Sequence, residues 1–334
     1  MTRHPRRVLA SILAALAVVA VVYLGIGPGP GLTSLPAAIM GAADRIDAFI
    51  FGQIRLPRLI VAAFAGAALA LAGAVMQATF RNPLASPDVI GTSAGAAFGG
   101  AIAIVTALAA LGVLAVPLAS FAGALLVTGL VFVLAGSHGS FSVASLLLAG
   151  IALNTLIGAL TSFVVTFTFD NYTASSRVLF WLMGGLEGRT WDHAWITVSG
   201  FVLFALLIAP RARQLDLLTL NDDSAHSLGL DGPRVRRRLL WFACGLTAAT
   251  VSNTGGIAFV GLVVPHLARL VVGPSHRILL PVAEAMGALL LVLGDMLCRA
   301  APPDSNLRLG VVTAVLGAPY FLFLLSRHRR GEVL

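Results

Sequence analysis

The stretch RLPRLIVAAFAGAALALAGAVMQATFRNPLASPDVIGTSAGAAFG, residues 55–99, decides the fold. No charged residue lies between Arg58 and Arg81, and an apolar segment of that length crosses a hydrocarbon core of roughly 30 Å as a helix. Pro83 and Pro87 then predict a tight turn before the next apolar segment, because proline interrupts a helix. The stretch therefore predicts two membrane-spanning helices joined by a short turn.

The same apolar pattern repeats along the whole chain. Hydrophobic residues make up 58% of the sequence and charged residues 11%, whereas a soluble domain carries about 25% charged residues. We therefore predict an all-α polytopic membrane protein, in which residues 1–334 form one transmembrane domain of about ten helices. The predicted spans are 8–27, 57–80, 88–108, 113–135, 143–168, 194–210, 239–255, 256–272, 278–298 and 308–326.

Arginines indicate the orientation of the chain. The first 27 residues resemble a signal peptide, with Arg3, Arg6 and Arg7 before an apolar run. That run is longer than a signal h-region and many spans follow it, so we predict a transmembrane helix. Ten spans place fifteen arginines on the inner side and seven on the outer side, in agreement with the positive-inside rule. We therefore expect a cytoplasmic-membrane protein with both termini in the cytoplasm.

The residue inventory excludes several kinds of chemistry. All 22 basic residues are arginine, so the chain has no P-loop lysine for ATP and no lysine for a Schiff base. We expect no catalytic residue, no bound cofactor, no metal and no nucleic-acid partner; another chain must bind ATP and Mg²⁺. Cys244 and Cys298 are predicted to be packing residues near opposite membrane faces. His266 and His276 lack the spacing of a metal site.

Glycines and tryptophans predict local features between the spans. Gly91, Gly95 and Gly99 recur at four-residue intervals, which places them on one helix face and favours close helix packing. In the outer loop 169–193, the segment VLFWLMGGL (178–186) predicts a short interfacial helix, with Trp181 and Trp191 as membrane anchors.

Residues 211–238, RARQLDLLTLNDDSAHSLGLDGPRVRRR, form a polar island between the sixth and seventh spans. Ten of the 36 charged residues of the chain lie in this island. Asn221 or Asp222 can cap a helix, Gly229 can end it, and Asp231 with Pro233 can start another. We therefore predict a folded module of two short helices. The alternative is a lipid anchor, which would not require an ordered helix–glycine–helix pattern.

Several motifs, taken in order, resemble one transporter family. The residues 55–99 quoted above follow its signature block. WLMGGLEGRTW (181–191), GGIAFVGLVVPHLARLVVGPSHRILLP (255–281), LGDMLCR (293–299) and LGVVTAVLGAPYFLFLL (309–325) match its later motifs. On these motifs the chain resembles the FecCD family, the permease subunits of type II ABC importers for iron-siderophores, haem and cobalamin. The resemblance implies ten helices per subunit and a second permease subunit, either a second copy or a homologous chain.

The resemblance gives the island a role. In the family, the loop between the sixth and seventh helices docks on the ATPase subunit. It therefore implies that the island couples this chain to an ATPase dimer through Asp223, Ala225, Ser227, Leu228 and Gly229. A rigid module suits this role because nucleotide-driven closure must be transmitted as a rigid-body shift.

The resemblance also assigns three outer arginines. Arg55, Arg58 and Arg299 match family positions that pair with acidic residues of a substrate-binding protein, and such pairs set orientation and on-rate. The alternative is that these arginines bond lipid phosphates at the membrane interface. Asp295 precedes Arg299 by four residues, so we expect a same-face pair between them.

The inner turn RNPLASP (81–87) carries a candidate gate. Asn82 and Leu84 resemble residues of the family's cytoplasmic gate, although a purely structural turn explains them equally. Ser142 lies at the opposing half of the gate, where family members can carry hydroxyl residues. This sequence reads Val143 and Ala144 beside Ser142, so that half departs from the family pattern.

Two rival classes have less support. An ion-coupled secondary transporter would need several intramembrane acids, and only Glu284 and Asp295 qualify. A membrane enzyme would need a clustered catalytic set, which the sequence lacks. Glu284 is either a functional acid or part of a helix contact. We therefore expect an ABC importer permease for iron(III)-siderophore complexes, with haem or cobalamin as alternatives. Its expected partners are the ATPase dimer, a substrate-binding protein, a second permease subunit and membrane lipid.

Overall fold

The computed structural model is built from helices. It describes residues 5–26, 31, 34–41, 43–106, 108–136, 142–168, 172–220, 222–302 and 305–329. Every regular element in these ranges is helical, which confirms the all-α prediction. Within them, six segments are long and apolar enough to cross a membrane: Pro5–Gly25, Arg45–Phe80, Ala115–Gly136, Val143–Thr166, Trp191–Leu218 and His276–Ala300.

Each of the ten predicted spans coincides with a helix. These helices are α1 (Pro5–Gly25), α4 (Leu56–Phe80), α5 (Thr92–Val105), α6 (Ala115–Gly136), α7 (Val143–Thr166), α9 (Trp191–Ile208), α12 (Gly232–Thr254), α13 (Val260–Val272), α14 (His276–Ala300) and α15 (Leu309–Arg329). The others are short: α2 (Leu35–Ile39), α3 (Arg45–Phe49), α8 (Tyr172–Leu182), α10 (Ala212–Leu218) and α11 (Asp222–Ser227), with 3-10 turns η3 (Pro87–Ile90), η4 (Leu108–Leu111) and η5 (Ala209–Arg211).

Three helical segments begin at other residues than the predicted spans, each for a local reason. The second span begins at Arg45 and not at residue 57, because α3 and a π-helical segment, η2 (Ile50–Arg55), run directly into α4. Helix α5, which corresponds to the third predicted span, begins at Thr92 and not at residue 88, because Pro87 starts a 3-10 turn ahead of it. Helix α12 begins at Gly232 and not at residue 239, because the helix predicted to start at Asp231 and Pro233 runs on into the seventh span; Asp231 accepts a hydrogen bond from the Arg234 amide and caps its first turn.

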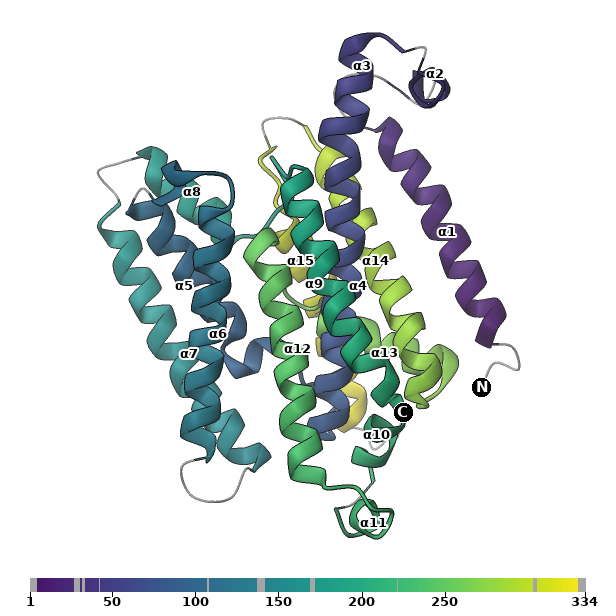
Figure 1. The fold of residues 1–334 in the computed structure, drawn as a ribbon, viewed down its shortest axis with the longest axis vertical. Helices are drawn as coiled ribbons and strands as arrows, with labels where there is room; N and C mark the ends of the chain where they lie inside the picture. The colour runs from purple at the N-terminus through teal and green to yellow at the C-terminus, as the bar shows by residue number, and fades with distance from the viewer. Residues whose placement is uncertain are drawn as a thin grey trace.

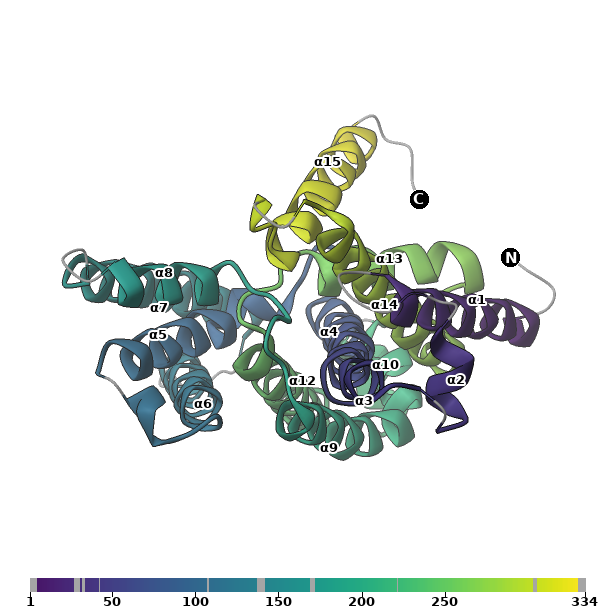
Figure 2. The same cartoon turned by 90° about the horizontal axis from the view of Figure 1, so that it is seen from above.

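Helix α4 is the centre of the bundle. Figures 1 and 2 show it surrounded by α9, α12, α13 and α14, and its side chains are buried along most of its length. Glycines permit this packing, because a Cβ built on Gly66 would overlap the carbonyl oxygen of Gly287 on α14. Gly73 meets the backbone of Gly261 on α13 in the same way. Small residues therefore allow the backbones of these helices to approach closely, which is how helices associate in lipid.

The predicted glycine stripe is confirmed as a packing surface. A Cβ on Gly95 would overlap the carbonyl oxygen of Gly123, and one on Gly99 would overlap that of Ala119, both on α6. Gly91 lies just before the helix in a left-handed conformation, with φ of 85°. It therefore sets the direction in which α5 begins.

The outer loop differs from its prediction. The short helix there is α8 (Tyr172–Leu182), which begins six residues before the predicted segment 178–186 and ends four residues before that segment does. Gly184, with φ of 66°, turns the chain after it, and Gly185 donates a hydrogen bond to the Thr254 carbonyl at 2.8 Å. Trp181 is not a membrane anchor, because it is 8% exposed and packs against Gly100 of α5. Trp191 donates to the Gly52 carbonyl at 3.0 Å and is likewise held by the protein.

Candidate functional site

The island (residues 211–238) is an ordered module at one end of the bundle. Figure 1 shows α11 at the end opposite α8. Helix α10, which was not predicted, buries Leu215 and Leu218 completely. The second predicted short helix is wrong, because its residues are the first turns of the long helix α12. Asn221, one of the two predicted caps, lies outside the described residues.

The predicted end of α11 at Gly229 is confirmed by its hydrogen bonds. The Leu230 amide donates to the Ala225 carbonyl at 3.0 Å, and the Gly229 amide donates to the His226 carbonyl at 2.8 Å. This is the Schellman arrangement, which requires a left-handed residue, and Gly229 has φ of 79°. Ala225 and Leu230 are buried beneath the turn, whereas Leu228 is 61% exposed. The turn therefore holds one large apolar side chain out toward solvent.

The island is attached to two membrane helices. Arg81, at the end of α4, donates from Nε to the Leu218 carbonyl at 2.7 Å. Asp216 of α10 accepts from the backbone amide of His276 at 2.8 Å and contacts its ring Nδ1 at 2.7 Å. These contacts fix α10 to the ends of α4 and α14 that lie beside the island. The proposed coupling residues Ser227, Leu228 and Gly229 lie exposed beyond this attachment, and the side chain of Asp223 lies outside the described part.

The three candidate gate residues make local contacts. The Asn82 side chain accepts a hydrogen bond from the Leu84 amide at 2.9 Å, which stabilises the predicted turn after α4. Ser142 caps α7 by accepting from the Ser145 amide at 3.1 Å. Asn82 is exposed, whereas Leu84 and Ser142 are half-buried.

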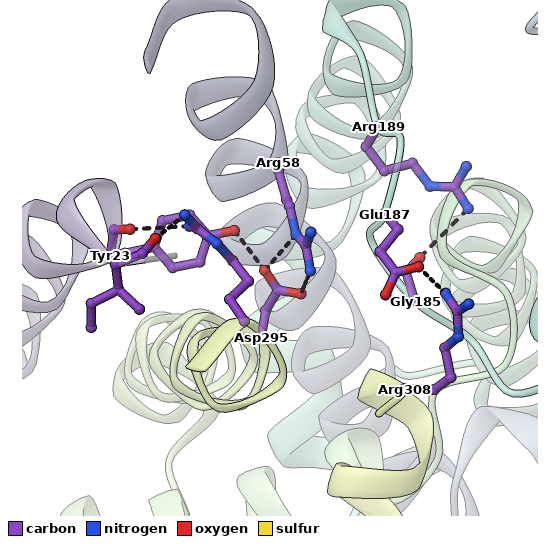
Figure 3. A network of polar contacts seen from close by, with 9 residues as sticks. Tyr23, Arg58, Gly185, Glu187, Arg189, Asp295 and Arg308 are labelled. Atoms are coloured by element: carbon purple, nitrogen blue, oxygen red, sulfur yellow. Dashed lines mark hydrogen bonds and ion pairs between the residues drawn. The ribbon is translucent and has the colours of Figure 1, made fainter. Parts of the chain in front are cut away.

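At the other end of the bundle, Asp295 of α14 is the centre of a buried polar network (Figure 3). It accepts two hydrogen bonds from Arg58, from Nε and Nη2, each at 2.8 Å, and a third from the Tyr23 hydroxyl at 2.5 Å. The expected pair between Asp295 and Arg299 was therefore wrong. Arg58 belongs to α4, which lies alongside α14, so its side chain reaches the carboxylate from the neighbouring helix.

The other two predicted docking arginines hold the end of α1. Arg299 donates to the carbonyls of Tyr23 and Ile26 and lies over the Tyr23 ring, 4.4 Å from its centroid. Arg55 is buried and donates to the Leu24 carbonyl. These guanidinium groups donate to carbonyls at and just beyond the end of α1, where a helix leaves acceptors without intrahelical partners; the Tyr23 carbonyl also accepts from the Ile26 amide at 3.3 Å. All three predicted arginines still line an outer cavity of about 440 Å³.

A second outer cluster was not assigned from the sequence. Glu187, in the loop after α8, pairs with Arg308 at the start of α15. Arg308 also lies over the Phe180 ring, 4.0 Å from its centroid. Arg189 lies beside them and donates to the Gly185 carbonyl at 3.5 Å (Figure 3). The sequence did indicate this cluster through the segment LEGR (186–189), where an acid and an arginine lie two positions apart.

The remaining candidates form no site within the described part of the chain. No group of three or more histidine, cysteine or acidic residues is close enough there to hold a metal. His276 is used by Asp216, and the His266 ring stands 6.3 Å from that of Tyr320. Glu284 is partly buried on α14, and no described residue pairs with it. Cys244 and Cys298 are free thiols.

The fold and these sites define an α-helical membrane transport protein, with an ordered module under one end and arginine networks at the other. The chain belongs to the FecCD transport family, whose model matches residues 9–327.

Relatives and a solved structure agree with this assignment. The cobalamin import permease BtuC of Halobacterium salinarum is 42% identical over 89% of this chain and 79% of its own. The iron(III) dicitrate permease FecD of Escherichia coli K12 is 40% identical over 84% of this chain and 86% of its own. A solved inward-facing structure, assigned to the metal-chelate type of ABC transporter, superposes with a TM-score of 0.85. It is 30% identical and covers 96% of this chain and 99% of its own.

Proposed function

We propose that this chain is the permease subunit of an ABC importer that carries iron(III)-siderophore complexes across the cytoplasmic membrane. A separate ATPase dimer binds ATP and Mg²⁺, a substrate-binding protein delivers the cargo, and a second permease subunit completes the pathway. The relatives support this class but differ in cargo, since one is a cobalamin permease and another an iron dicitrate permease. Haem or cobalamin import by the same mechanism is the alternative.

The observation that carries the proposal is the exposed Leu228 on a rigid, anchored turn. The turn holds this apolar side chain at the exposed tip of the island, where a pocket of a partner can receive it. The turn is fixed by its two backbone hydrogen bonds and by the contacts of α10 with α4 and α14. A partner that moves Leu228 therefore moves the membrane helices, as coupling to an ATPase requires.

Docking on the outer face completes the proposed cycle. The loaded binding protein docks beside Arg55, Arg58 and Arg299, which line an outer cavity. Nucleotide binding in the ATPase then acts through the island, and the turn carrying Asn82 opens the pathway inward. Because the binding protein selects the cargo, the pathway does not need a set of strong ligands of its own.

Uptake by cells tests the proposal. Cells without their own permease receive this chain with its ATPase and binding protein, and uptake of radioiron-siderophore, haem and labelled cobalamin is measured. Leu228→Arg should lower uptake more than about tenfold, the loss expected for a central apolar contact. Leu111→Arg makes the same change at an exposed leucine of the opposite end and should leave uptake near that of the parent.

Two results would contradict the proposal. Undiminished uptake by Leu228→Arg, with normal membrane insertion, would show that the island only anchors the chain to lipid. Uptake that continues without ATPase would place the energy source elsewhere.

A further inference from the structure

A cavity of about 410 Å³ opens at the outer end of the bundle, beside the loop between α8 and α9. Its lining residues differ from those of the cavity of Arg55, Arg58 and Arg299, except for Glu187, which borders both cavities. Its charged wall consists of three arginines, one from α8, one from the loop and one directly before α15, and a single acid. These residues are Arg177, Arg189, Arg308 and Glu187, and the aromatic residues Phe180 and Trp181 form the adjoining wall.

The charges in this cavity are not balanced. Glu187 pairs with Arg308 through Nη1 alone, and the buried Nε of Arg308 has no hydrogen-bond partner among the described residues. The Nε of Arg189 is also buried and unpartnered within that part, and its one donated hydrogen bond is 3.5 Å long. Burial, followed by the nearby charge of Arg58, lowers the pKa of Arg189 to about 10. Two guanidinium groups with buried, unpartnered nitrogens that share a single acid favour an added anion.

Three other arginines at this end of the bundle are satisfied within the chain. Arg58 is bound on two sides by Asp295, while Arg55 and Arg299 donate to carbonyls at the end of α1. The buried donor nitrogens still open at this cavity are therefore the Nε atoms of Arg189 and Arg308, whereas Arg177 on the same wall is exposed. Guanidinium nitrogens form a planar fork that matches the two oxygens of a carboxylate. A volume of a few hundred Å³ with aromatic walls is typical of small-molecule sites.

We infer that this cavity receives a carboxylate of the imported complex, so that the cargo is an anionic metal chelate with free carboxylates. This inference rests on the proposed function and narrows its substrate class. Iron citrate carries free carboxylates and haem carries two, whereas cobalamin carries amides in their place. Glu187 pairs with Arg308 in this structure, and the cargo carboxylate would replace or join it there.

Binding of iron(III) citrate to the assembled permease–ATPase complex, in nanodiscs at low salt, tests the inference directly. Equilibrium dialysis with radioiron gives Kd, and unlabelled cobalamin is the uncharged competitor. Arg189→Gln should raise Kd about tenfold or more, the loss of one charge-assisted hydrogen-bonded pair. Glu187→Gln should lower Kd, because it removes the one competing carboxylate. Arg45→Gln, which changes an exposed arginine on α3, should leave Kd unchanged.

The opposite signs of the two cavity variants separate binding from misfolding, since a folding defect would weaken both. Equal Kd values for the parent, Arg189→Gln and Glu187→Gln would overturn the inference, as would displacement of iron citrate by cobalamin. Arg189→Gln could instead weaken only the docking of the cargo-free binding protein. That result would assign the cavity to a carboxylate of the binding protein and would also overturn the inference. In each case ATP-dependent uptake by the parent complex would leave the proposed permease function standing, whereas absent uptake of all three cargoes would refute that function as well.

Discussion

Asp295→Asn is expected to destabilise the folded protein by about 3–5 kcal/mol, the cost of breaking a buried ion pair from one side. The carboxylate is 1% exposed and accepts three hydrogen bonds, while the Arg58 side chain is 15% exposed. An asparagine amide carries no charge and presents an NH₂ donor where a second acceptor is needed. The Arg58 guanidinium then stays buried without a counter-charge, which is the main source of the loss.

The measurement is unfolding of the purified permease in mild detergent by titration with SDS, followed by tryptophan fluorescence. Asp192→Asn is the matched control, because Asp192 is exposed in the first turn of α9. There only the helix-dipole contribution of about 0.3–1 kcal/mol should be lost. Replacing both partners, Arg58→Met with Asp295→Leu, should cost less than Asp295→Asn alone, because no charge is then left unpaired.

The reasoning fails if Asp295→Asn costs no more than Asp192→Asn. It also fails if the double variant is as unstable as the sum of its single changes, since coupled partners are not additive. Either result would mean that water or another group compensates Arg58 in the membrane-embedded protein.

Two glycine substitutions test the packing and the island. Gly66→Ala should cost about 1–3 kcal/mol in the same titration, because its Cβ overlaps the backbone of α14. Gly158→Ala is the control, because a Cβ there meets no atom within 4 Å. Equal stability of the two variants would contradict the packing argument. Gly229→Ala places a Cβ at φ of 79°, which costs about 1–2 kcal/mol. It should speed hydrogen exchange over residues 222–230 and reduce ATPase stimulation, whereas Gly232→Ala, with open space around it, should do neither; unchanged exchange in Gly229→Ala would show that the turn tolerates the strain.

Local chemistry explains what the sequence predicts well. Apolar length and arginine placement identify the ten helices, because both follow directly from the hydrocarbon core. The end of α11 at Gly229 and the start of α12 at Asp231 are equally local, since each depends on residues within one turn. The glycine stripe at Gly95 and Gly99 also reads correctly, because close helix approach in lipid requires small residues on one face.

Long-range pairing explains what the sequence does not predict. Arg58 and Asp295 are 237 positions apart, and nothing near either residue distinguishes this pair from the nearer candidate, Arg299. Arg299 instead finds carbonyls of α1, 276 and 273 positions away. A charged residue at a helix end has several possible partners, and the packing of the whole bundle decides among them. The same limit hides the cavity of Arg189, whose wall comes from segments far apart in the sequence.

The two ends of the molecule are connected by one helix pair. At the inner end, Arg81 of α4 and His276 of α14 hold α10 of the island. At the outer end, Arg58 of α4 binds Asp295 of α14. Between them the backbones touch at a glycine on each helix, where little rotation is possible without overlap. We therefore expect a displacement of the island to move the arginine network at the other end with it as a rigid body. Gly66→Ala separates this pair at its midpoint, so it should reduce coupled ATP hydrolysis and uptake even in detergent or lipid conditions where the variant stays folded.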